Sequence, residues 1–154
     1  MNLPRYALVS SDKMTTFEFV SEGNNGKIHK IVQYQPTNLK DVYNLAFGDK
    51  NTQTGEVSDE VISNNGDSEK VLATVVATIY AFTDKYPEVW IYATGSTKAR
   101  TRLYRMGISK FFEEAKNDFD IFGELIDDWE EFKLNIEYEG FLVKRKNKNY
   151  ESNK

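Results

Sequence analysis

The sequence predicts one α+β domain, in which a mainly antiparallel or mixed sheet of about five or six strands is packed by three helices. Segments with apolar residues at every second position, typical of strands, occur beside segments with the three-to-four spacing of amphipathic helices. A chain of 154 residues is one domain by length, and its ten Phe, nine Tyr and two Trp can fill a core. We expect residues 1–146 to form this domain and the basic segment 147–154 to be a disordered tail.

A β-hairpin is predicted near the N-terminus. Phe17 and Phe19 alternate with polar residues, and a turn-forming segment follows at residues 22–26. A second apolar alternation covers residues 28–34, so the two segments read as paired strands. An earlier strand near residues 6–9 also fits the pattern.

The segment after the hairpin predicts the first helix. Thr37 is a good N-cap, and Gly48 is well placed as the C-terminal cap. The inward positions of this helix are Leu39, Val42, Tyr43 and Ala46. Residues 50–66 are polar and contain either one short strand around residues 56–62 or only a loop.

A second and a third helix flank a central strand. Asp67 or Ser68 caps the second helix, whose wide apolar face continues to about Tyr86. Residues 89–94 are apolar on both sides, as expected of an interior strand covered on each face. The third helix covers residues 97–116.

The C-terminal part predicts strands. Residues 119–125 suit one strand, and the alternation at Phe132, Leu134, Ile136 and Tyr138 predicts a last long one. Gly140 interrupts this alternation, which suggests a bulge.

The turn between the central strand and the third helix has the greatest chemical content. Gly95, Ser96 and Thr97 precede a helix whose first half carries the cations Lys98, Arg100, Arg102 and Arg105 and no acid. Free backbone N–H groups and the positive end of the helix dipole make such a helix start a candidate anion site. The candidate ligand-binding residues are Gly95, Ser96, Thr97, Arg100, Arg102 and Arg105.

Arg100 is the unusual member of this set, because it falls on the apolar side of the helix. Arginine is rarely buried without a partner, and a cation in the first turn opposes the helix dipole. One explanation is a buried ion pair with a carboxylate, for which the candidates are Glu137, Glu139 and Asp120. The other is a phosphate or carboxylate ligand held by Arg100 and the backbone N–H groups of the turn.

Composition and charge limit the function classes. The chain contains no cysteine, which excludes disulfides, thiolate metal sites and cysteine nucleophiles, and its single histidine, His29, lies in phase with the solvent side of its strand. The net charge of −4 disfavours nucleic acid as a partner. The basic blocks at 97–112 and 141–154 and the acidic block at 118–139 are expected to neutralise one another. Without a signal segment or a long apolar run, we expect a cytoplasmic protein that does not enter the membrane.

The strings GSTKARTRLYRMGI, NLAFGD and YEGFLVKRK together resemble a family of short, uncharacterised bacterial proteins of the Bacteroidetes type, a domain of unknown function. The resemblance covers nearly the whole chain and implies a single-domain cytoplasmic protein, with no activity attached. A weaker similarity is to nucleotidyltransferases, whose Gly-Ser turn and Ala-Arg pair are matched by Gly95, Ser96, Ala99 and Arg100. Their metal-binding Asp-x-Asp pair follows at about half the separation found here for Asp118 and Asp120, which lie beyond a helix about 30 Å long.

These observations favour a non-enzymatic binding or regulatory module with an anion site at the turn. A protein carboxylate, a nucleotide phosphate or a nucleic-acid backbone would each suit it, and we expect no cofactor, metal or catalytic residue. Two alternatives stay open. One is a small metal-dependent phosphoryl- or nucleotidyl-handling enzyme using Asp118 and Asp120, and the other is a purely structural turn with Arg100 in a buried ion pair.

Overall fold

The structure, a computed structural model, describes residues 4–51, 53–58, 65–95 and 97–147. The helices are α1 (Ser68–Lys85) and α2 (Lys98–Asp118). The strands are β1 (Val9–Ser10), β2 (Thr16–Gly23), β3 (Gly26–Pro36), β4 (Val42–Lys50), β5 (Val57–Ser58), β6 (Trp90–Ala93), β7 (Phe119–Glu124), β8 (Trp129–Glu131) and β9 (Gly140–Arg145). The α+β class holds, but the expected five or six strands and three helices are wrong, because the described residues form one nine-stranded sheet and two helices.

The sheet is mixed. Its strand order is β1-β2-β3-β4-β6-β9-β7-β8, and β5 pairs beside this path with β4. The pairing of β4 with β6 is parallel and joins Val42–Asn44 to Trp90–Tyr92, whereas the other described strand pairs are antiparallel. The sheet therefore consists of two antiparallel groups of strands joined by one short parallel contact.

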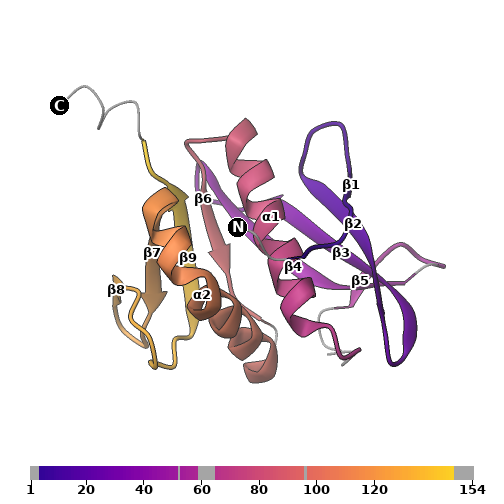
Figure 1. The fold of residues 1–154 in the computed structure, drawn as a ribbon. Helices are drawn as coiled ribbons and strands as arrows, with labels where there is room; N and C mark the ends of the chain where they lie inside the picture. The colour runs from indigo at the N-terminus through magenta and orange to yellow at the C-terminus, as the bar shows by residue number, and fades with distance from the viewer. Residues whose placement is uncertain (1–3, 52, 59–64, 96, 148–154) are drawn as a thin grey trace.

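Both helices lie on the same face of the sheet (Figure 1). We call this the inner face and the opposite one the outer face. The core lies between the helices and the inner face, where the ring of Phe82 in α1 stacks on Tyr34 of β3 with centroids 4.1 Å apart. The Tyr34 hydroxyl and Thr78 of α1 share a hydrogen bond of 2.8 Å, which satisfies two buried polar groups. This face accounts for most of the apolar burial that stabilises the fold.

Several predicted elements are confirmed. The hairpin is formed by β2 and β3, with the turn closed at the pair Gly23↔Gly26, and β7 occupies the predicted strand after α2. Helix α1 begins after Asp67 as expected, but the Asp67 carboxylate caps no helix amide. It accepts hydrogen bonds of 2.5 Å from the hydroxyls of Tyr6 and Ser21 instead, so it ties the helix start to the sheet.

The helix predicted after Thr37 is wrong, because this segment is strand β4. Tyr43, Leu45 and Phe47 occur at every second position and face the core, so the helical spacing read from Leu39 to Ala46 is coincidental. The Thr37 hydroxyl caps a tight turn and donates 2.8 Å to the carbonyl of Val42. Gly48 ends no helix and lies within β4 opposite Ile31.

The last long strand predicted across Phe132–Tyr138 is also wrong. This segment turns back on itself, with Asn135 in the left-handed region at φ 65 and the rings of Phe132 and Tyr138 only 5.6 Å apart. The final strand is β9, and Gly140 is its first residue rather than a bulge within a longer strand.

Strand β6 is central, as predicted, but the described helices cover only its inner face. Ile91 and Ala93 are buried there, whereas Trp90 and Tyr92 remain partly exposed on the outer face. Among the described helices, none is apolar enough along its length to cross a membrane. Of the predicted tail, residues 148–154 lie outside the described residues.

Candidate functional site

The turn from β6 into α2 is held by two threonine side chains. Thr97 has an extended backbone and is the N-cap of α2, where its hydroxyl accepts a 3.1 Å hydrogen bond from the backbone N–H of Arg100. The hydroxyl oxygen of Thr101 accepts a 3.0 Å hydrogen bond from the backbone N–H of Gly95. The helix start predicted from sequence is therefore confirmed to within one residue, and two of its amides already have acceptors.

The backbone amides of Lys98 and Ala99, at the start of α2, are not bonded by these threonine hydroxyls. Both belong to the first turn of α2, where backbone N–H groups have no carbonyl of the preceding turn to bond. Neither amide has an acceptor within the residues that the structure describes. Because α2 has no acidic residue in its first turn, the dipole at this end is not neutralised by the helix itself.

The close packing around position 95 leaves no space for a side chain, so this residue has to be glycine. A Cβ on Gly95 would lie 2.5 Å from the Cβ of Arg100 and 2.5 Å from the backbone nitrogen of Thr101, distances too short for non-bonded atoms. The backbone of Gly95 is not in the left-handed region, so the glycine serves close packing of the turn against α2.

Arg100 faces inward, as its position on the helix predicts, and is only 2% exposed. Its guanidinium carbon lies 5.4 Å from the centroid of the Phe47 ring of β4, a cation–π arrangement. Lys30 of β3 lies 5.9 Å from the same centroid, and its ammonium donates to the carboxylate of Asp49. Arg100 therefore belongs to a polar cluster within the core, between α2 and the inner face.

The three carboxylates considered as partners of Arg100 lie elsewhere. Glu137, Glu139 and Asp120 are all exposed, and Glu137 lies 3.9 Å from Arg105 instead. The acidic residue of the buried cluster is Asp49, which sequence reasoning missed because it ended a helix at Gly48 and expected no strand there. The period-two spacing of Leu45, Phe47 and Asp49 is the signal that places Asp49 on the inner face.

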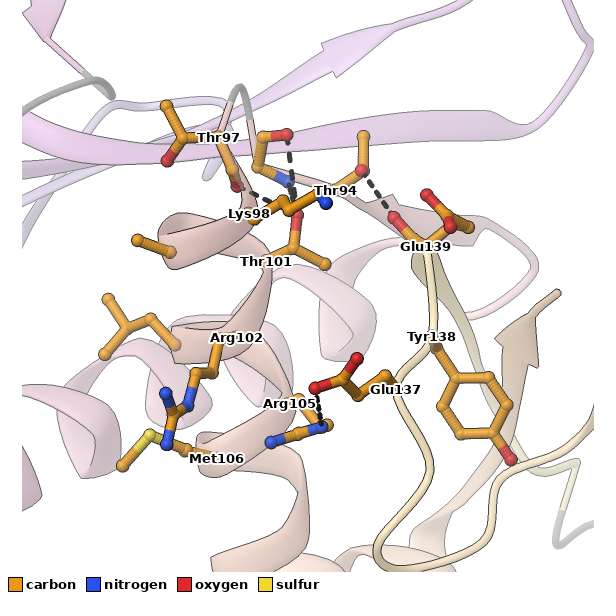
Figure 2. A pocket seen from close by; sticks show the side chains of 13 residues that line it. Thr94, Thr97, Lys98, Thr101, Arg102, Arg105, Met106, Glu137, Tyr138 and Glu139 are labelled. Carbon is orange, nitrogen blue, oxygen red and sulfur yellow. Dashed lines mark hydrogen bonds and ion pairs between the residues drawn. The ribbon is translucent and has the colours of Figure 1, made fainter. Parts of the chain in front are cut away.

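An open groove of about 850 Å³ lies beside the turn, between the exposed side of α2 and the segment before β9 (Figure 2). One wall is basic and is formed by Lys98, Arg102 and Arg105 of α2. The facing wall contains the acidic residues Glu137 and Glu139. We call this cavity the α2 groove.

The two walls are tied together at one end. The Thr94 hydroxyl donates a 2.8 Å hydrogen bond to the carbonyl of Glu139, and Arg105 lies 3.9 Å from Glu137 across the groove (Figure 2). Glu137 is 94% exposed, so this ion pair is solvated and weak. Arg102 and Lys98 are exposed and form no described ion pair.

The α2 groove brings together most of the residues that the sequence singled out. Gly95, Thr97, Arg102 and Arg105 line it, together with the adjacent cation Lys98. Arg100 does not line it, and Ser96 lies outside the described residues. Sequence reasoning missed Thr94 and Thr101. It named Glu137 and Glu139 only as possible partners of Arg100, because the fold is what brings residues 137–139 to the exposed side of this helix.

The aspartates of the enzyme alternative lie at the other end of α2. Asp118 ends the helix, which at 21 residues is about 30 Å long, and accepts a 2.6 Å hydrogen bond from the Tyr80 hydroxyl. Asp120 follows in β7, and neither residue lines the α2 groove. The described geometry therefore brings neither aspartate to the Gly95 turn.

The basic and acidic blocks form few described ion pairs with one another, in contrast to the expected neutralisation. Among the described residues, the ion pair between segments 97–112 and 118–139 is Arg105–Glu137. Other cations of α2 pair elsewhere, Lys110 with Glu69 and Lys116 with Glu113. In the second basic block, Lys144 and Arg145 likewise pair outside the acidic block, with Glu88 and Asp84. Several carboxylates of the acidic block consequently remain on the surface without a described cationic partner.

A comparison with models of protein families identifies the family of this chain. The model of a family of unknown function (DUF6934) matches residues 2–146, and the chain belongs to this family. No curated protein and no solved structure matches the chain significantly. The expected resemblance to a domain of unknown function is thereby confirmed.

Proposed function

We propose that this member of a family of unknown function is a non-enzymatic binding module, whose α2 groove receives an anionic group. The observation that carries the proposal is the coincidence of three features in one open cavity. Lys98, Arg102 and Arg105 line it, the first turn of α2 opens onto it, and the amides of Lys98 and Ala99 have no described acceptor.

The two walls of the groove select among anions. A compact carboxylate or phosphate group at the start of α2 meets the dipole and the cations Lys98 and Arg102. A long polyanion would also pass Glu137 and Glu139, whose charges repel it. The proposed ligand is therefore a single anionic group, carried by a protein partner or a small molecule, rather than a nucleic-acid backbone.

The test is amide NMR with inorganic phosphate as the probe. Phosphate should shift the backbone signals of Lys98 and Ala99 first, since these N–H groups point out of the helix start. The amides of Gly95 and Arg100 should respond less, because hydroxyl groups already accept from them. Raising the salt should weaken the response, because exposed charges are screened beyond about 10 Å at 0.1 M.

The matched control uses cations of the same helix that lie outside the groove. Lys98→Gln with Arg102→Gln should weaken phosphate binding about tenfold, the usual scale for losing charge-assisted contacts. Lys110→Gln with Lys116→Gln removes the same charge and should leave the affinity unchanged. Equal weakening by both pairs, or shifts spread evenly over all basic residues, would mean nonspecific charge binding and would refute the proposal.

A further inference from the structure

The outer face of the sheet carries an aromatic surface that no described helix covers. Its members, which we call the outer aromatic patch, are Trp90, Tyr92, Phe122 and Trp129. Trp90 and Phe122 have ring centroids 5.9 Å apart, and Tyr92 and Trp129 meet at 6.1 Å with an interplanar angle of 69°. Trp129 is 40% exposed, so this patch presents aromatic surface to solvent.

The patch is bordered by carboxylates. The Tyr92 hydroxyl donates a 2.7 Å hydrogen bond to Glu124, which is paired in register with Trp129 of β8. Glu131 is paired with Phe122 across the same two strands. Neither Glu124 nor Glu131 forms a salt bridge among the described residues.

The cation that β9 presents on this face lies away from Trp129. Lys144 lies toward the C-terminal end of β9, opposite Asp120 and 3.9 Å from Glu88. Glu124 pairs with Gly140 at the other end of β9, on the side of Trp129. The end of the patch formed by Tyr92, Trp129 and Glu124 is therefore both aromatic and negative.

From this juxtaposition we infer that the outer aromatic patch docks a lysine- or arginine-bearing segment of a partner protein. A cation over the rings of Tyr92 and Trp129 gains the cation–π attraction, while Glu124 and Glu131 neutralise its charge. The long aliphatic part of lysine or arginine covers the apolar rings.

The negative charge beside the patch disfavours two other possible partners, single-stranded nucleic acid and a second copy of this chain. Single-stranded nucleic acid stacks on aromatic sheet faces, but it requires a cationic groove for its phosphates, and carboxylates border the Tyr92–Trp129 end of this patch. A second copy of the chain packed symmetrically on this face would present the same carboxylates to one another. A basic protein segment is the partner whose charge complements Glu124 and Glu131.

Tryptophan fluorescence provides a direct test, because both tryptophans of the chain lie in the patch. The probe is a peptide of alternating lysine and glycine, and the matched control is a peptide of alternating glutamate and glycine. The lysine peptide should shift the emission in a saturable way, and the glutamate peptide should not. Salt should weaken the binding, as expected of attraction between exposed charges.

Variants separate docking from general charge attraction. Glu124→Gln with Glu131→Gln should weaken the lysine peptide about tenfold, and Trp129→Leu should weaken it similarly. Glu69→Gln with Glu113→Gln removes the same charge from the helix side and should change little. Circular dichroism checks folding, which Trp129→Leu should preserve because this residue is on the surface.

Four outcomes would overturn the inference. They are an unchanged emission with the lysine peptide, equal weakening by the control pair, tighter binding of oligouridine RNA, and a dimer in sedimentation that Trp129→Leu dissociates. Lys98→Gln with Arg102→Gln should not alter peptide binding, so this inference and the proposed role of the α2 groove can fail independently.

Discussion

Gly95 and Arg100 lie in direct contact, so that the turn before α2 packs on the arginine side chain that enters the core. Any Cβ at position 95 would come within 2.5 Å of the Arg100 Cβ. The glycine, the capping hydroxyl of Thr97 and the inward arginine thus form one structural unit.

Gly95→Ala should destabilise the fold by about 1–3 kcal/mol, because the added methyl group has no space. Gly107→Ala is the contrasting variant. Its nearest neighbour is a terminal carbon of Leu72 at 3.0 Å, and replacing a helical glycine by alanine gains about 1 kcal/mol. Urea unfolding measures both, and a Gly95→Ala variant as stable as Gly107→Ala would show that the turn relaxes easily.

Arg100→Ala should cost about 2–5 kcal/mol, since it empties a buried site and removes the contact with the Phe47 ring. Arg102→Ala on the exposed side of the same helix should stay within about 0.5 kcal/mol. Thermal or urea melts compare the two. Similar small losses would contradict a structural role for the inward arginine.

Asp49→Asn should destabilise the fold by about 3–5 kcal/mol, because it leaves the Lys30 ammonium, whose side chain is only 6% exposed, without its carboxylate. The control is Glu18→Gln, which removes the more exposed pair with Lys50 on the outer face and should cost about 1 kcal/mol or less. Urea titration measures the free energy of unfolding of both variants. A loss for Asp49→Asn no larger than for Glu18→Gln would argue that the buried pair contributes little.

Stability should fall at alkaline pH. Burial, together with the hydrogen bond to Glu124, raises the pKa of Tyr92 to about 12 from its ordinary 10.0, and burial also raises the pKa of Tyr34 and Tyr80. Above pH 10 the unfolded chain loses phenolic protons that the folded chain keeps, so this stability is complete below pH 10 and is lost as the pH rises through 12.

Unfolding at about pH 9 and about pH 11.5 measures this slope. Tyr92→Phe should show a smaller pH-dependent loss, because it removes one of the shifted groups. A free energy of unfolding that does not change over this range would contradict the tyrosine environments described above.

The elements predicted correctly are those whose period is long and unambiguous. Helix α1 and the β2–β3 hairpin carry their apolar pattern over many residues, so local spacing was sufficient. In β4, helical and strand spacings overlap between Leu39 and Phe47, and the pairing with β3 decides between them. A single sequence does not contain that long-range information.

Of the two walls of the α2 groove, the sequence predicted only the basic one. The cations of α2 and the turn at Gly95 follow from local sequence, whereas Glu137 and Glu139 reach the groove through the return of the chain before β9. The alternation at Phe132–Tyr138 obscured this return, because a left-handed Asn135 leaves no trace in an apolar pattern. The open outer face was missed for a related reason, since apolar residues on both sides of β6 suggested a strand covered on both faces.

The parallel pairing between β4 and β6 has a consequence for how the protein unfolds. Strands β1 to β4 pair with sequence neighbours, whereas strands β6 to β9 pair among themselves across α2, so each group forms its contacts within its own part of the chain. Among the described strands, the short joint at Val42–Asn44 and Trp90–Tyr92 connects the groups, and the helices pack above it. We therefore expect hydrogen exchange to reveal two cooperative units, with the amides of this joint opening before the interior of either unit.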